Sequence, residues 1–169
     1  MSPTRRQVLA ASAGVAVAGG LGAGTMAWRW WERPPGAGLA QLATDEHAFV
    51  QALAEAWMPK GGEPSLSGAD AALGDFFDGI VDGMHPSTGR ELRLLLAGLD
   101  ALTLPTHLAR YHALGLGDRQ EVLRSWLHSD VTLLRSGVHA VVALVSLGWT
   151  SHPDVAERLR PYFRCGYSR

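Results

Sequence analysis

Histidines and a row of aspartates are the side chains of this sequence best suited to acid–base or metal chemistry. Seven histidines are present. His107 and His112 are five residues apart, which on a helix places their side chains about 140° apart, a poor geometry for sharing one metal ion. The others occur singly, and we expect structural roles for them. His139 lies in an apolar segment, so we expect it to be hydrogen-bonded in the core or at an interface.

Asp75, Asp78 and Asp82 follow one another at i, i+3 and i+7. A hard cation needs more oxygen ligands than one helix face supplies, so a solvated face is the better interpretation. No HExxH, Glu-x-x-His or GxSxG motif occurs, and no GxGxxG follows a predicted strand. The single Cys165 excludes an internal disulfide, an iron–sulfur cluster and a CxxCH haem site. The sequence therefore predicts no catalytic, cofactor-binding or metal-ligating residue in this chain.

The opening stretch TRRQVLAASAGVAVAGG pairs Arg5 with Arg6 ahead of an uncharged run rich in Ala and Gly. This pattern is typical of a twin-arginine export signal, which addresses folded proteins to the periplasm. Residues 7–28 carry no charge, and as a helix they would span about 33 Å, roughly one bilayer core.

Trp28, Trp30 and Trp31 end this run and resemble an interfacial aromatic belt, which favours a retained inner-membrane anchor. The small-x-small step at residues 25–27 is also an acceptable cleavage site, so both fates of the leader stay open. We predict a signal peptide or anchor with its linker over residues 1–35, and a single helical domain over residues 36–169.

The body of the chain reads as one helix after another, so the predicted fold class is all-α: a small irregular bundle of about five to six helices behind the leader. Residues 45–58 place Phe49, Leu53 and Trp57 on one face. Capping-box patterns begin at Thr88 and at Asp118. Further helices are expected over residues 69–84, over the apolar segment 130–149, and from Pro153 onwards, where proline suits a first turn.

The charge-free segment from Ser136 to Pro153 is long enough to raise the question of a second membrane span. It contains several polar side chains, which argue against lipid. We expect a central core helix, or a helix buried against another protein.

Composition restricts the class of protein. Hydrophobic residues make up 47% and the formal net charge is −1, as in a globular domain. No basic cluster lies outside the leader, so no nucleic-acid partner is expected. Acids dominate between Asp45 and Asp82, and arginines between Arg119 and Arg169. This separation of acidic from basic residues either orients a binding partner or is a chance distribution of charge over a solvated surface.

The C-terminal segment from Leu147 to Arg169 mixes aromatic and rigid residues with arginines, the residue types enriched at interface hot spots. We favour docking over a loose terminus. Together with the apolar helix, this gives the following candidates for partner binding: His139, Trp149, Pro153, Tyr162, Phe163 and Tyr167.

A signal for folded cargo in a chain with no recognisable cofactor site points to a second protein. If the cofactor belongs to a partner that has no signal of its own, the complex folds in the cytoplasm and crosses the membrane as a unit.

The order of segments resembles the gluconate 2-dehydrogenase subunit 3 family over nearly the whole chain. After the leader, the matching segments are EHAFVQALAEAWMPKG, GADAALGDFFDGIVDGM, ARYHALGLGDRQEVLRSWLHS and VVALVSLGWTSHPDV. LGDRQEVLRSW looks like the family's short capped helix, and LGWTSHPDV is similar to its late turn. The family's usual ending is altered here to AERLRPYFRCGYSR.

This resemblance implies a non-catalytic small subunit of a membrane-associated complex. Its large subunit would be a GMC-type FAD-dependent dehydrogenase acting on a sugar, polyol or other alcohol, and a cytochrome c subunit often receives the electrons in such complexes. FAD is then expected in the partner and not in this chain. Two alternatives stay open: a membrane-anchored periplasmic adaptor with an unrelated partner, and a stand-alone exported enzyme with an unrecognised site.

Overall fold

The structure is a computed structural model of the 169-residue chain, and it describes residues 33–62 and 65–161. Judged by its internal contacts, the chain forms two compact units, Met1–Arg33 and Pro34–Arg169. The second unit is described below. Several predicted sites lie outside the described residues. These are the export arginines Arg5 and Arg6, the tryptophans Trp28, Trp30 and Trp31, and the tail aromatics Tyr162, Phe163 and Tyr167.

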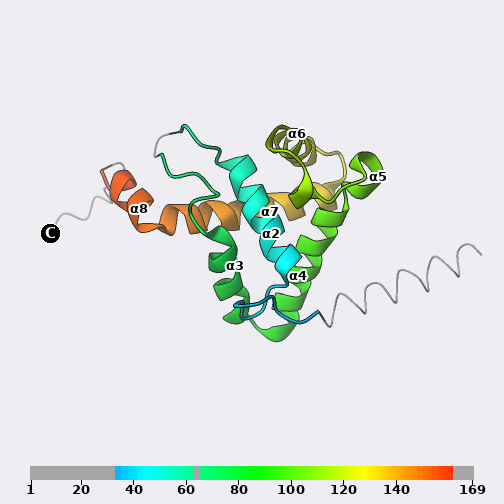
Figure 1. Ribbon diagram of the computed structural model, residues 1–169, viewed down its shortest axis with the longest axis horizontal. Coiled ribbons are helices and arrows are strands. Elements are labelled where there is room, and N and C mark those ends of the chain that lie inside the picture. Colours follow the sequence, from blue (N-terminus) through cyan, green and yellow to red (C-terminus); the bar gives the residue numbers. More distant parts are fainter. Residues whose placement is uncertain (1–32, 63–64, 162–169) are drawn as a thin grey trace, which may run out of the picture. The chain divides into compact units, whose positions relative to one another are not determined.

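The described part of the chain is all-α, as predicted, and contains no strand (Figure 1). It has five helices of ten or more residues and two shorter ones. In chain order the elements are α2 (Thr44–Trp57), α3 (Leu73–Asp82), α4 (Pro86–Ala101), α5 (Leu104–His107), the 3-10 turn η1 (Tyr111–Ala113), α6 (Leu116–Leu127), α7 (Thr132–Ser151) and α8 (Pro153–Leu159).

Helix α2 is the centre of the domain, because α3, α4, α6, α7 and η1 all pack against it. Phe49 and Leu53, on the face that the sequence predicts, are both 0% exposed. Trp57 continues that face but lies at the end of the helix and is 42% exposed. Its indole Nε1 donates to Ser146 Oγ of α7 at 3.0 Å, which joins the C-terminal end of α2 to α7.

An aromatic cluster closes the core beside α2. Tyr111 stacks on Trp126 with ring centroids 5.2 Å apart and meets Phe49 edge-on at 5.4 Å. The Tyr111 hydroxyl donates to the carbonyl of Arg119 at 3.1 Å. Burial raises the pKa of this hydroxyl well above its usual range, although nearby Arg119 acts in the opposite direction. Tyr111 is therefore a neutral donor that fixes η1 against α6.

Two helices begin earlier than their capping-box patterns indicate. Helix α4 begins at Pro86 with His85 as its N-cap, and not after Thr88. Proline at the first helical position has the required φ and lacks an N–H that would be unpaired there in any case. Helix α6 begins at Leu116, so Asp118 lies in its first turn, where a carboxylate favours the helix dipole. The sequence pattern was right about the helices and wrong about their first residues.

Helix α7 is the longest in the described chain, and its bounds, Thr132–Ser151, lie within two residues of the predicted apolar segment 130–149. Its inner face packs against α2, α3 and α6 through Val138, Val141, Val142, Val145 and Gly148, which are all buried. At Gly148 a Cβ would collide with the ring of Phe76, so the glycine permits the close approach of α3. The prediction of a core helix is confirmed for this face.

By length and composition alone, α7 is also the one helix of the described chain that is able to cross a membrane. Its 18-residue window has a mean hydropathy of 1.3, and only 28% of that window is buried inside the domain. A helix of this hydropathy thus leaves most of its residues at least partly uncovered.

Candidate protein-docking surface

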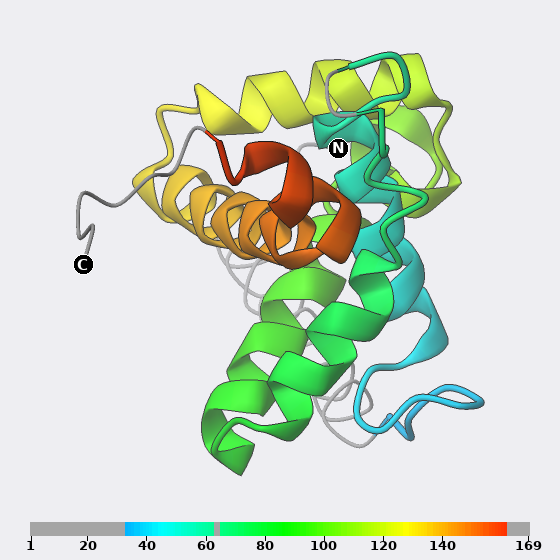
Figure 2. The same cartoon turned by 90° about the vertical axis from the view of Figure 1, so that its left-hand side faces the viewer.

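The outer face of α7 is an uncharged surface that the domain's own helices leave uncovered. It consists of the exposed residues Thr132, Leu133, Ser136, His139, Ala140, Ala143, Leu147, Thr150 and Ser151. Their spacing of three and four places them in one stripe along the helix. Leu133 is 84% exposed and Leu147 is 55% exposed. In Figure 2, α7 (yellow to orange) runs from the left edge of the domain towards its middle, and α2 (cyan) lies to the right of α7.

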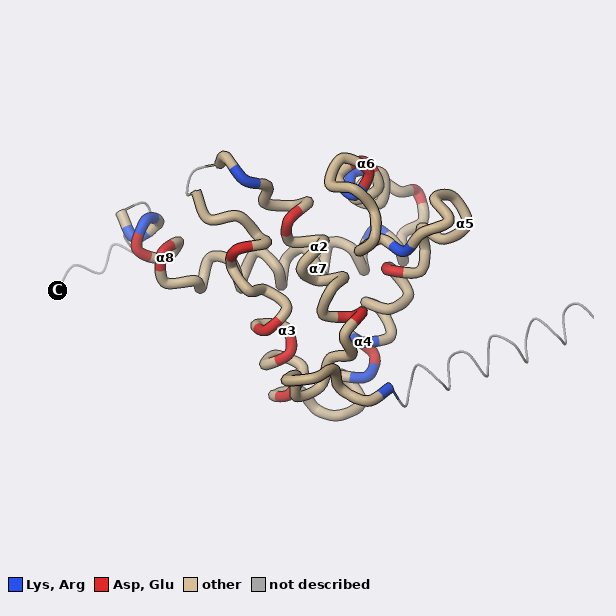
Figure 3. The backbone as a smooth tube through the Cα atoms, in the orientation of Figure 1, with Lys and Arg blue, Asp and Glu red and all other residues tan. Residues whose placement is uncertain are grey.

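No residue of this outer face is charged. The one charged side chain of α7, Arg135, is only partly exposed and donates through Nη1 to the carbonyl of Ser129 at 2.5 Å. Helix α6 is the contrast, because it exposes Asp118, Glu121 and Arg124. Most of α7 is tan in Figure 3, whereas α3, α6 and α8 carry red or blue segments. A solvated helix face ordinarily resembles α6.

His139 lies in the middle of the outer face and is exposed. The expectation that the His139 side chain is hydrogen-bonded in the core is therefore wrong. The buried positions of α7 are those of the inner face, which begins with the neighbouring residue Val138. A helix turns by about 100° per residue, so one step in sequence separates an inner from an outer position. The alternative, an interface role for His139, stays a prediction.

Trp149 and Pro153 serve the fold of the domain itself. Trp149 packs against the core, and its Nε1 donates to the carbonyl of Leu66 at 2.9 Å, which holds the loop after α2 onto α7. Pro153 is exposed and opens α8, as predicted, and His152 is the N-cap, with Nδ1 accepting from the amide of Asp154 at 3.4 Å. Their predicted contact with a partner stays a prediction.

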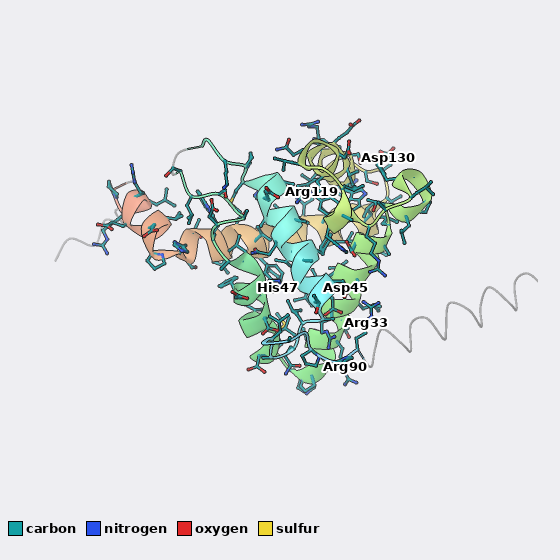
Figure 4. The ribbon with its side chains drawn as sticks, in the orientation of Figure 1. Arg33, Asp45, His47, Arg90, Arg119 and Asp130 are labelled. Atoms are coloured by element: carbon teal, nitrogen blue, oxygen red, sulfur yellow. The ribbon has the colours of Figure 1, made fainter. Side chains whose placement is uncertain are left out.

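Part of the acidic stretch at the start of the domain is engaged in ion pairs. Three of its acids pair with arginines far along the chain: Glu46 with Arg93 at 2.8 Å, Glu55 with Arg119 at 2.9 Å, and Asp45 with Arg110 at 2.9 Å. Figure 4 places Asp45 and Arg119 near opposite ends of α2. Of these arginines only Arg119 belongs to the basic C-terminal stretch, so an orienting role for the charge separation stays a prediction.

Asp78 also departs from its predicted place on a solvated face. It is 7% exposed and accepts backbone N–H bonds from Ala40, Gln41 and Leu42 at 2.6, 2.9 and 2.7 Å. Burial acts to raise the pKa of this carboxyl, but the three N–H donors outweigh it, and the pKa lies below its usual value. Asp78 lies four residues after Gly74, and both residues are on the buried face of α3. This spacing could be read from the sequence.

A second buried carboxylate, Asp100, was missed at the sequence level. Its side chain is 1% exposed and accepts from His112 Nδ1 at 2.8 Å, from the His112 amide at 3.1 Å and from Arg110 Nη1 at 3.2 Å. A carboxylate that orients a histidine is part of a hydrolytic triad, which also needs a nucleophile on the ring. Both hydrogen bonds described for His112, from its amide and its Nδ1, go to Asp100, so the pair is assigned to fixing η1 on α4.

A cavity of about 770 Å³ opens between the loop after α2 and helix α8. Its charged lining residues, Asp70, Asp154, Glu157 and Arg158, are all exposed. Asp70 is engaged by Ser67 Oγ at 2.6 Å and by Lys60 at 3.6 Å. Within the described ranges, no group of three or more His, Cys, Asp or Glu side chains is placed to hold a metal ion.

Comparison with known proteins adds no relative: no protein-family model, no curated protein and no solved structure matches this chain. The function is therefore argued from the chain's own residues, and among the described ones the uncharged outer face of α7 is the strongest lead.

Proposed function

We propose that this protein is a non-catalytic small subunit of an oxidoreductase complex. It escorts a folded FAD-dependent dehydrogenase of the GMC type through twin-arginine export and stabilises that enzyme in the complex. Three observations support the proposal: the paired arginines Arg5 and Arg6, the segment order that resembles gluconate 2-dehydrogenase subunit 3, and the outer face of α7.

The outer face of α7 is the observation that carries the proposal. Full burial of a leucine side chain is worth roughly 1.5–3 kcal/mol, so Leu133 and Leu147 leave stabilisation unused while they face water. Depletion of charge and exposure of apolar side chains are the properties of the core of a protein–protein interface. Permanent complexes use such surfaces over more than about 2,000 Å². A second protein that covers this face would recover that stabilisation.

The division of labour follows from the resemblance. FAD and the oxidation of a sugar, polyol or other alcohol belong to the partner, and a cytochrome c subunit is the expected electron acceptor. In this proposal the chain contributes the export signal and a binding surface. Its location is the periplasm, at the inner membrane, where the tryptophans Trp28, Trp30 and Trp31 suit the membrane interface.

Isolation of the tagged full-length chain from solubilised membranes tests this proposal. We expect one large protein to co-purify in fixed stoichiometry, to release FAD on denaturation, and to be identified by mass spectrometry as a flavin dehydrogenase. If the chain instead purifies without a flavoprotein and carries stoichiometric metal or a chromophore of its own, the proposal is wrong and the stand-alone enzyme is correct. An identified partner without flavin indicates the unrelated adaptor.

A further inference from the structure

We draw no further inference here: the strongest candidate, the cavity between the loop after α2 and helix α8, carries nothing because its charged lining residues are all exposed and nothing in the structure shows what fills it.

Discussion

Leu42 and Asp78 are 36 residues apart in sequence, and the Leu42 amide donates a 2.7 Å hydrogen bond to Asp78 Oδ1. The amides of Ala40 and Gln41 donate to the same carboxylate. One side chain of α3 thus fixes the backbone that leads into α2, and α2 organises the rest of the core. The ionised form of this carboxylate therefore stabilises the entry into α2.

Asp78→Asn should lower the free energy of unfolding by about 1–3 kcal/mol. An amide has one oxygen in place of two, and its NH₂ group is a donor facing other donors. Asp82→Asn is the control, since Asp82 is exposed and accepts a side-chain hydrogen bond from Gln41 Nε2 at 3.0 Å. Urea unfolding of the domain measures both. Equal effects of the two substitutions would show that the three backbone bonds add nothing.

The pH dependence of stability should reveal the same group. The folded-state pKa of Asp78 is below the usual 3.8, so its contribution is complete above that value and is lost as the pH falls through the folded pKa. We expect the stability gap between wild type and Asp78→Asn to be constant from pH 7 to about pH 5 and to shrink below pH 4. Thermal melts at half-unit intervals check this. A gap that is unchanged at pH 2.5 contradicts the assignment.

Ala72→Gly should stabilise the domain by about 0.5 kcal/mol. Ala72 precedes α3 with φ 48°, in the left-handed region where a Cβ is strained, and its side chain is exposed. Glycine relieves the strain, and part of the gain is offset by its greater freedom in the unfolded chain. Ala143→Gly, within α7, is the matched control and should cost up to about 1 kcal/mol. Destabilisation by both substitutions would refute the strained conformation.

The isolated domain should self-associate. Leu133 and Leu147 remain in water when residues 36–169 are expressed alone, and an uncharged face offers no repulsion between copies. Replacing both leucines by glutamate should give a monodisperse domain with unchanged helix content, as measured by sedimentation and circular dichroism. A wild-type domain that is already monodisperse and melts cooperatively would count against an interface on α7.

The helices were predictable from the sequence because their signals are local. The burial of Phe49 and Leu53 follows from their four-residue spacing, and the start of α8 follows from Pro153. The apolar segment gave the existence of α7. It did not give the exposure of His139, since a nearly uniform apolar run does not mark which face turns inward.

The ion pairs could not be predicted from the sequence, because they join residues that are far apart in the chain. Glu46 and Arg93 are 47 residues apart, and Glu55 and Arg119 are 64 apart. The sequence around each charged residue does not predict which distant residue pairs with it. Asp100 is similar, because a lone aspartate near a helix end gives no sign that folding buries it under Arg110 and His112. Such contacts depend on how the helices pack against one another, and a short stretch of sequence does not determine that packing.

Co-export is the measurement that tests the central claim most directly. The periplasmic and cytoplasmic amounts of the FAD-containing partner are compared in cells that express the wild-type chain, the Arg5→Lys, Arg6→Lys double variant, and Ala140→Glu. We predict that the double arginine variant strands both proteins in the cytoplasm, because the partner uses this chain's signal. Ala140→Glu should itself reach the periplasm while its partner stays behind. Normal periplasmic levels of the flavoprotein beside the double arginine variant would contradict the escort function.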